Sequence, residues 1–407
     1  MLPILLASIP FVQIGITYYL SFATAIAIII TARFLTTSFR FTPPNIWMLA
    51  IGIAACLFLS SVAVPGSTSE DIFRSGREAL FFLLTTAALA GSYSLSGFQI
   101  KRSTHRYMFA IILGIFCIVL IQALTLGKRI YFGLPRALFI QNGEMLPTAL
   151  DLRYSHIRPF GTFGEPSYLA FVLLSLLVMI TPTLKSAIIT LGERSPKNKR
   201  RVVSQIHIFA ITGAILIGAA GMMSESLSFY LAFPLLLYVG AIRYASGRVK
   251  FWLAVVGIVV LTAAAGDVIS TVVLGRLSRG ASDVSLAARI LIPLQILPQY
   301  LFENPLGAPP SRLLAEVNGF VSQYNIQGIE ILHNAFFNLI FCYGIIAFPA
   351  IALLLKATKS LYISLYIVAC AMLNGALFAV DKYAVITLSV AIYHGYRKIY
   401  SNNGQAA

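Results

Sequence analysis

Two polar stretches of an otherwise apolar chain, residues 127–163 and 275–333, contain arginines that could bind an anion. Those that we single out are Arg153, Arg158, Arg276, Arg279 and Arg289. Arginine keeps its charge in a poorly hydrated site, and its planar fork of N–H groups bonds two oxygens of a phosphate at once. These five residues are therefore candidates for binding a diphosphate group.

The first stretch ends beside a glutamate that could handle protons. In the segment RPFGTFGEPSYLAF, residues 158–171, Glu165 directly precedes Pro166. A carboxylate held near Arg158 could bind sugar hydroxyls or accept a proton, so Glu165 is a candidate catalytic residue. The alternative is that Glu165 only caps a helix, because proline fits the first turn of a helix and an acid suits its positive end.

Two histidines lie in the same stretches. His333 and Asn334 end the second stretch, and His156 lies near the end of the first. A neutral imidazole can take a proton from a hydroxyl group. We therefore predict His333 as a second candidate catalytic residue, and Asn334 and His156 as substrate-binding residues. The alternative is that each histidine is an ordinary hydrogen-bonding residue at a membrane interface.

The sequence lacks the patterns that are typical of metal or disulfide sites. It contains no DxD or HExxH motif and no cluster of carboxylates. Its cysteines each lie inside an apolar run: Cys56, Cys117, Cys342 and Cys370. We expect an enzyme that uses no metal or other cofactor, in which arginines stabilise the developing negative charge.

The elements that must position these residues are membrane-spanning helices. The 407 residues are 58% hydrophobic and 11% charged, with a mean hydropathy of +0.85, whereas a soluble domain carries roughly 25% charged residues. Apolar runs of about 20 residues, the length that a helix needs to cross a bilayer, recur along the chain. We predict an all-α, polytopic membrane protein with a single integral membrane domain, residues 1–407.

Twelve spans can be placed, and the two arginine-containing stretches become the long loops between them. The first two spans form either a tight hairpin or one broken helix. Within the second long loop, residues 283–302 predict an interfacial helix that Pro293 and Pro298 interrupt. The predicted spans are 3–18, 20–35, 46–64, 78–96, 107–126, 164–184, 204–221, 226–242, 251–274, 334–355, 360–379 and 383–396.

The distribution of charge predicts the orientation. Most of the 30 lysines and arginines fall on the side that holds the N-terminus, including the tract ERSPKNKRR at 193–201. Basic residues are enriched in cytoplasmic loops, so both termini are expected in the cytoplasm and both long loops outside. The same rule accounts for the net charge of +16 without a nucleic-acid partner.

Three short motifs resemble the bacterial O-antigen ligase and polymerase superfamily. His333 and Asn334, followed after nine residues by Gly344, resemble its His-Asn…Gly signature, although Ala347 departs from that pattern. The segment GTFGEPSYLA at 161–170 resembles a stretch that is common in O-antigen and capsule polymerases. The segment around Arg289 that leads into ENPLGAPP is similar to the loop before the His-Asn pair.

The resemblance implies a fold and a role for particular residues. It implies a C-type glycosyltransferase fold in which Arg289 contacts the diphosphate and His333 serves as the base or assists it. Ligases of this superfamily often carry Ser-Arg-Gly after the seventh span, where this chain has residues 224–226 with the sequence SES. The missing arginine favours a polymerase, leaves a diphosphate contact for Arg158 or Arg153, and makes Glu225 a candidate substrate-binding or helix-capping residue.

The expected function is therefore that of an O-antigen polymerase in the bacterial inner membrane. Its substrates would be glycans linked to undecaprenyl diphosphate, as donor and acceptor, with a chain-length regulator as a further possible partner. The alternatives are an O-antigen ligase that transfers glycan to lipid A core, a peptidoglycan-type polymerase, and a polysaccharide transporter or flippase. A transporter is disfavoured because the spans hold few ionisable residues, chiefly Asp267, and no repeated halves.

Overall fold

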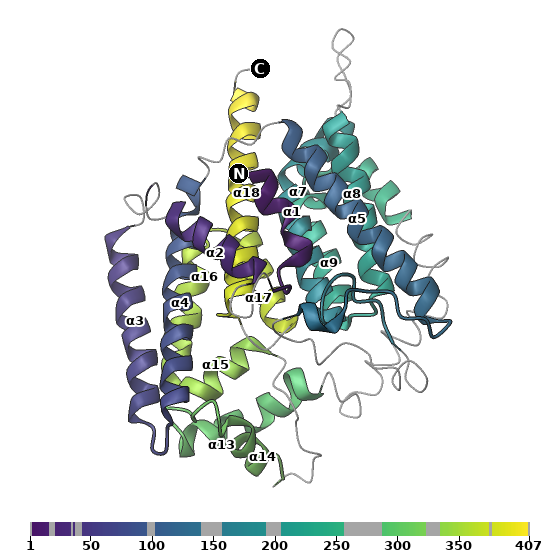
Figure 1. Ribbon diagram of the computed structural model, residues 1–407. Helices are drawn as coiled ribbons and strands as arrows, with labels where there is room; N and C mark the ends of the chain where they lie inside the picture. Colours follow the sequence, from purple (N-terminus) through teal and green to yellow (C-terminus); the bar gives the residue numbers. More distant parts are fainter. Residues whose placement is uncertain are drawn as a thin grey trace. The chain divides into compact units, whose positions relative to one another are not determined.

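The computed structural model is mainly helical in the part of the chain that it describes (Figure 1). Apart from two isolated bridges, Ile14 with Phe139 and Gly15 with Ser21, these residues form no β-structure. The all-α fold that the sequence predicts is therefore confirmed for them. The described residues are 2–15, 21–33, 36, 43–95, 102–139, 157–192, 205–255, 287–322, 334–373 and 377–405.

Six helices are long and apolar enough to cross a membrane, as expected of a helical membrane protein. Each overlaps one of the predicted spans, because a run of apolar residues in lipid must satisfy its backbone hydrogen bonds internally. The number twelve stays a prediction, since the ninth predicted span lies mostly outside the described residues. The six are Pro44–Ala63, Thr104–Leu126, Pro166–Thr190, Gln205–Met223, Leu227–Tyr244 and Ala335–Ala357.

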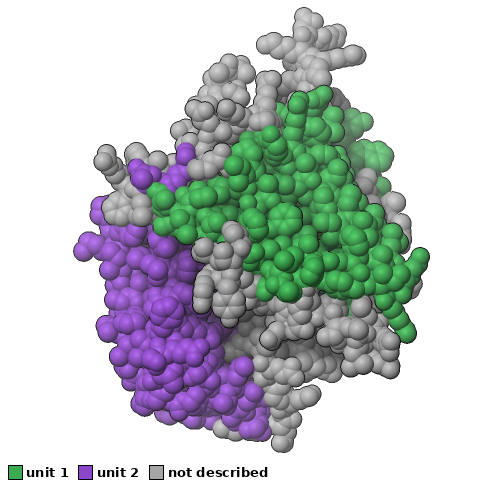
Figure 2. Space-filling model, viewed as in Figure 1, with its two compact units in different colours: residues 1–32, 92–273, 384–407 green, residues 33–91, 274–383 purple. Residues whose placement is uncertain are grey.

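The chain divides into two compact units (Figure 2). Unit 1 comprises residues Met1–Ala32, Ser92–Val273 and Ala384–Ala407, and unit 2 comprises Arg33–Gly91 and Leu274–Tyr383. Each unit thus brings together segments that are far apart in the sequence. The single membrane domain expected from the sequence stays a prediction.

Unit 1 is built around four apolar helices: α5 (Arg102–Leu126), α7 (Pro166–Gly192), α8 (Gln205–Met223) and α9 (Leu227–Gly240). The almost wholly buried α7 packs against α8 and α9, and α8 also packs against α5 (Figure 1). Gly213 of α8 fits closely between Ile112 and Ile180. Small residues on α8 therefore allow close helix packing, which in lipid relies on van der Waals contact.

The N-terminal segment of unit 1 is a tight hairpin rather than one broken helix. It consists of α1 (Leu2–Ala7), the short 3-10 helix η1 (Ile9–Phe11) and α2 (Phe22–Arg33). The backbone N–H of Phe22 donates to the carbonyl of Ile14 at 3.1 Å, so the chain reverses between α1 and α2.

Unit 2 contains a helical hairpin, α3 (Pro44–Ala63) with α4 (Ser69–Leu95), and several shorter helices. The described part of the helix predicted at 283–302 is the π-helical turn η9 (Ala287–Leu291) followed by α13 (Ile292–Glu303), and Pro298 lies within α13 without ending it. Its interfacial position stays a prediction. The others are α14 (Leu313–Ser322), α15 (Ala335–Tyr343), η10 (Gly344–Ile346), α16 (Ala347–Ala357) and α17 (Leu361–Leu373). The helix α18 (Val380–Gln405) begins in unit 2 and continues in unit 1.

Candidate functional site

Unit 1 brings together three of the predicted site residues at one end of its helices. Arg158 donates from Nη1 to the backbone carbonyl of Glu225 at 3.0 Å. Glu225 lies in the turn between α8 and α9, and Glu165 directly precedes α7. All three side chains are partly buried. This end of unit 1 therefore holds one guanidinium and two carboxyl groups on three neighbouring segments.

A buried glutamine fixes the loop that carries Arg158 and Glu165. Gln122 of α5 is 0% exposed and bonds backbone groups only. Its Oε1 accepts from the N–H groups of Phe160 and Gly161, at 3.0 and 2.7 Å, and its Nε2 donates to the carbonyls of Phe132 and Gly161, both at 2.8 Å. Gly161 adopts a φ of 68°, which a glycine tolerates without strain. One side chain thereby satisfies four backbone groups of the loop and its surroundings.

The N-terminal hairpin holds the same loop from another direction. Oε1 of Gln13 accepts from the N–H of Gly164 at 2.8 Å, and the Thr162 hydroxyl donates to the carbonyl of Pro10. Gln13 is 4% exposed, and its Nε2 makes no hydrogen bond within the described part of the chain. Neither glutamine was predicted from the sequence, because a single polar residue in an apolar run gives no indication of its distant partner.

Glu165 occupies the position before the first turn of α7. Its backbone carbonyl accepts from the N–H groups of Tyr168 and Leu169, and its Oε1 accepts from the Ser167 hydroxyl at 2.5 Å. The carboxylate therefore lies near the positive end of the α7 dipole. This position suits helix capping, and it also leaves a partly exposed carboxylate beside the loop of Arg158.

The turn that contains Glu225 has a strained backbone. Glu225 adopts a φ of 50°, in the left-handed region that residues other than glycine seldom occupy. On either side, Ser224 and Ser226 are buried, and the Ser224 hydroxyl donates to the carbonyl of Gly221 at 2.7 Å. Such strain costs of order 1 kcal/mol or more and persists where the surroundings enforce it. Here it turns the carbonyl of Glu225 toward Arg158.

Unit 2 holds a second group of predicted site residues, Arg289 with Asn334. Arg289 lies in the π-helical turn η9 and donates from Nη1 to the carbonyl of Met372 at 3.3 Å. Nδ2 of Asn334 approaches the carbonyl of Arg289 at 3.3 Å and Sδ of Met372 at 2.9 Å. π-Helical turns occur often at functional sites. The backbone of Arg289 is therefore held by the asparagine of the His-Asn motif.

Asn334 also caps the helix that follows it. Its Oδ1 accepts from the N–H groups of Phe336 and Phe337, at 2.9 and 3.4 Å, and the side chain is 3% exposed. The same amide thus starts α15 and positions Arg289. Direct contact of Asn334 with a substrate stays a prediction.

Gly344 of the same motif meets the ENPLGAPP segment at close range. A Cβ at Gly344 would lie 1.9 Å from the carbonyl oxygen of Pro305, and one at Gly307 would lie 2.3 Å from that of Cys342. Both glycines have positive φ, at 56° and 83°. Only glycine permits such an approach without a shift of the backbone. The two segments that we compared separately with the superfamily are therefore packed together.

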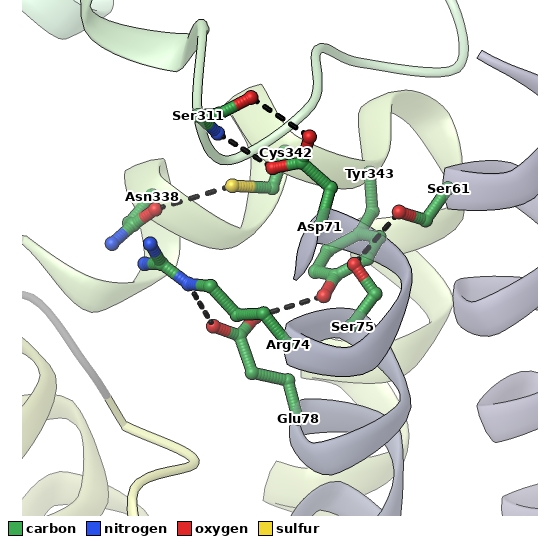
Figure 3. A network of polar contacts seen from close by, with 9 residues as sticks. All are labelled: Ser61, Asp71, Arg74, Ser75, Glu78, Ser311, Asn338, Cys342 and Tyr343. Atoms are coloured by element: carbon green, nitrogen blue, oxygen red, sulfur yellow. Dashed lines mark hydrogen bonds and ion pairs between the residues drawn. The ribbon is translucent and has the colours of Figure 1, made fainter. Parts of the chain in front are cut away.

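A polar network that the sequence analysis missed connects α4 to the 304–312 loop and α15 (Figure 3). Asp71, which is 2% exposed, accepts hydrogen bonds from the N–H and hydroxyl of Ser311, at 2.8 and 2.7 Å, and from those of Thr68, at 3.0 and 2.8 Å. Burial alone would raise the pKa of the Asp71 carboxyl, but these bonds favour the charged form more strongly. The pKa is lowered from 3.8 to about 2.

The same network includes an ion pair. Nε of Arg74 lies 3.3 Å from Oε1 of Glu78, and the Tyr343 hydroxyl donates to Oε2 of Glu78 at 2.8 Å. Figure 3 shows these side chains converging between α4 and α15. The network joins α4 to α15, the helix that Asn334 caps. It therefore helps to fix the helix whose capping residue binds the backbone of Arg289.

Five predicted site residues lie outside the described part of the chain: Arg153, His156, Arg276, Arg279 and His333. Their assignments stay predictions. Among the described residues, no group of three histidines, cysteines, aspartates or glutamates could hold a metal ion.

Comparison with known proteins adds no assignment. No model of a known protein family matches the chain, and no curated protein matches its sequence significantly. A function must therefore be argued from the two residue groups and from the motif resemblance.

Proposed function

We propose that the protein is a membrane glycosyltransferase of the O-antigen polymerase type. It would join oligosaccharide repeat units that are carried on undecaprenyl diphosphate, at the periplasmic face of a bacterial inner membrane, with both termini in the cytoplasm. The observation that carries the proposal is the hydrogen bond from Arg158 to Glu225. Through this bond, the guanidinium of Arg158 lies at the turn 224–226. Ligases of the resembled superfamily carry an arginine of their own at this turn.

The residues suit a transfer that needs no metal. A hydroxyl of the acceptor sugar attacks the anomeric carbon of the donor, and its proton passes to a base, either His333 or Glu165. The new C–O bond forms as the bond to the diphosphate breaks, and the leaving diphosphate takes the electron pair. Arginines placed where this negative charge develops, Arg158 and Arg289 among them, would stabilise it.

The anchoring of Arg289 is a second support. Its backbone is tied to Asn334 and its guanidinium to Met372. A guanidinium whose rotamers are restricted loses less entropy when it binds an anion. Gly344 and the ENPLGAPP segment, which the resemblance also involves, pack against each other in the same unit.

The test is polymer formation by the purified protein in liposomes that contain lipid diphosphate-linked repeat units. Arg158→Ala should abolish the ladder of products, and Arg158→Lys should lower the rate by roughly tenfold or more, because lysine keeps the charge but lacks the fork. Lys128→Ala, an exposed residue of the same loop, is the matched control and should match the wild type. A normal ladder from inserted Arg158→Ala protein would contradict the assignment of Arg158.

A cellular experiment separates polymerase from ligase. In cells that make lipopolysaccharide, loss of a polymerase leaves lipid A core with one repeat unit, whereas loss of a ligase leaves bare core. We expect deletion of this chain to give the single repeat. Bare core after deletion would overturn the polymerase assignment in favour of the ligase.

A further inference from the structure

Three cationic side chains gather at the other end of the unit 1 helices, away from Arg158 and Glu165. Lys185 lies 19 residues beyond Pro166 on α7, which at 1.5 Å per residue is about 28 Å along the helix axis. That length is close to the thickness of the hydrocarbon core of a bilayer. If α7 spans the membrane with Glu165 at one surface, Lys185 lies at the opposite surface.

Two of these cations lie over one tyrosine ring, and the third acts electrostatically on its hydroxyl. Nζ of Lys185 lies 3.7 Å from the centroid of the Tyr244 ring, and Cζ of Arg243 lies 4.6 Å from it. Arg243 also donates from Nη2 to the Tyr244 hydroxyl, and Arg397 acts electrostatically on the same hydroxyl. Arg243 and Tyr244 form part of η6 (Ile242–Tyr244), which packs against α7.

A buried series of hydrogen bonds fixes the part of α18 that precedes Arg397. His105 of α5 is bonded through Nε2 to the Thr183 hydroxyl at 3.1 Å and through Nδ1 to the Tyr396 hydroxyl at 3.3 Å. Thr183 is two residues from Lys185, and Tyr396 adjoins Arg397. The cluster is therefore held by three helices and is not a chance meeting of surface side chains.

The positive charge of the cluster is not balanced within the described part of unit 1. The carboxylates described there, Glu165 and Glu225, lie at the other end of the helices. Lys185 and Arg243 are no farther apart than about 8 Å, the sum of their distances to the ring, and two like charges at about that distance repel by roughly 0.5–2 kcal/mol. The two contacts with the ring, at roughly 0.5–1 kcal/mol each, are of the same size as this repulsion. An anion between the cations would remove the repulsion.

We propose that Lys185, Arg243 and Arg397, arranged around Tyr244, bind the phosphate headgroup of an anionic phospholipid. Arginine can grip two phosphate oxygens and lysine adds a point charge, while a tyrosine ring suits the depth of the headgroups. Basic pockets between membrane helices are known to bind such headgroups on the cytoplasmic side. The proposal is independent of the reaction at the other end of the unit.

The test compares two double variants that remove the same charge. Lys185→Gln with Arg243→Gln removes the cluster, and Arg248→Gln with Lys250→Gln removes two basic residues that follow it in sequence. Each protein is titrated in neutral detergent with phosphatidylglycerol, phosphatidylcholine or inorganic phosphate, and binding is read from the thermal unfolding midpoint and from native mass spectrometry. A charge-retaining variant, Lys185→Arg with Arg243→Lys, shows whether the substitutions themselves disturb folding.

We expect the wild type to bind phosphatidylglycerol at least about tenfold more tightly than the cluster variant, corresponding to about 1.4 kcal/mol. The control and the charge-retaining variant should stay within about twofold of the wild type. Equal binding by the cluster variant, or equal binding of phosphatidylcholine by the wild type, would overturn the proposal. Inorganic phosphate that saturates the site as readily as the lipid would show a free-anion site instead. If the cluster variant does not fold, the proposal is tested on the wild type alone. It then requires tighter binding of phosphatidylglycerol than of phosphatidylcholine, and equal binding of the two lipids would overturn it.

Discussion

Two glutamines of unit 1 bind the same loop but differ in how many of their amide atoms form hydrogen bonds within the protein. Gln122 uses both its oxygen and its nitrogen on backbone groups, so its carboxamide is saturated by the protein. Gln13 uses its oxygen on Gly164, and its buried nitrogen makes no hydrogen bond with the described residues. A buried donor that lacks a partner costs free energy, which a substrate oxygen would recover on binding.

Because of this difference, we expect the substitution of glutamine by glutamate to affect binding at position 13 and stability at position 122. Gln13→Glu keeps the acceptor for Gly164 but replaces the amide nitrogen by oxygen. If that nitrogen donates to a sugar oxygen, the KM for the acceptor should rise by about tenfold with little change in the unfolding temperature. Gln122→Glu instead leaves the carbonyls of Phe132 and Gly161, the latter buried, without their donor, so it should lower the free energy of unfolding by about 2 kcal/mol or more.

The two measurements are acceptor kinetics in liposomes and thermal unfolding in detergent. A Gln13→Glu protein that is destabilised as much as Gln122→Glu would show that both amides are merely structural. Unchanged acceptor kinetics in a stable Gln13→Glu protein would equally contradict a substrate contact. Absence of polymer from the wild type would contradict the proposed function itself, before any variant is compared.

How far the sequence predicts single residues depends on how local their contacts are. Glu165, Arg289 and Asn334 could be selected because each lies in a short motif with a recognisable chemistry. Gln13 and Gln122 could not, since their partners lie 151 residues away and up to 39 residues away. Nothing in a linear pattern of apolar residues tells which distant backbone a buried amide will meet.

At the scale of elements, Asp71 ties the start of α4 to the loop before α14. Its carboxylate accepts bonds from Ser311 of that loop and from Thr68. Asp71→Asn supplies an N–H donor where an acceptor is needed, so the connection should weaken. Hydrogen bonds to charged groups contribute about 1.5–3 kcal/mol each, and we expect a loss of about 2 kcal/mol in the free energy of unfolding at pH 7. Glu70→Gln, the same loss of charge at an exposed neighbour, is the control and should have little effect.

The pH dependence of this contribution follows from the lowered pKa. The folded-state pKa of Asp71 is about 2, below its ordinary value of 3.8, so the unfolded chain binds more protons in this range. The stabilisation is complete above about pH 4 and is lost as the pH falls toward 2. Thermal unfolding of the wild type and of Asp71→Asn should therefore converge as the pH is lowered. A difference in unfolding temperature that stays constant from pH 7 to 3 would contradict this role of the carboxylate.

The helices themselves were largely predictable, and their interruptions less so. An apolar run long enough to cross a bilayer has little choice but to be helical, which is why six predicted spans coincide with long apolar helices. The tenth predicted span is divided at Gly344 into α15 and α16. The glycine at position 344 can be read from the sequence. The structure requires a glycine there because the carbonyl of Pro305 approaches closely, and such a contact between distant segments cannot be read from the sequence.

At the scale of the molecule, the helices of unit 1 alternate in direction as membrane hairpins do. The end of α5, the start of α7 and the α8–α9 turn meet at one end, where Gln122 and Arg158 bond them together. The other ends of α7 and α9 meet at Lys185 and Tyr244. This alternation matches the order of spans that the sequence predicts between residues 107 and 242. Among the described residues, it makes the two ends of unit 1 chemically different, with the carboxylates Glu165 and Glu225 at one and the cations around Tyr244 at the other.

The orientation of these ends across the membrane can be tested with two exposed residues of unit 1. Lys128 follows α5 at the Arg158 end, and Arg248 follows η6 at the Tyr244 end. We expect Lys128→Cys, in a background without the native cysteines, to react with a membrane-impermeant maleimide on intact spheroplasts, because the proposed topology places the arginine-containing loop outside. Arg248→Cys should react only after permeabilisation, because basic residues are retained on the cytoplasmic side. The reverse pattern would invert the topology and place the Arg158 group in the cytoplasm, where a periplasmic glycan could not reach it. Labelling of both residues from outside would mean that the helices between them do not separate two compartments.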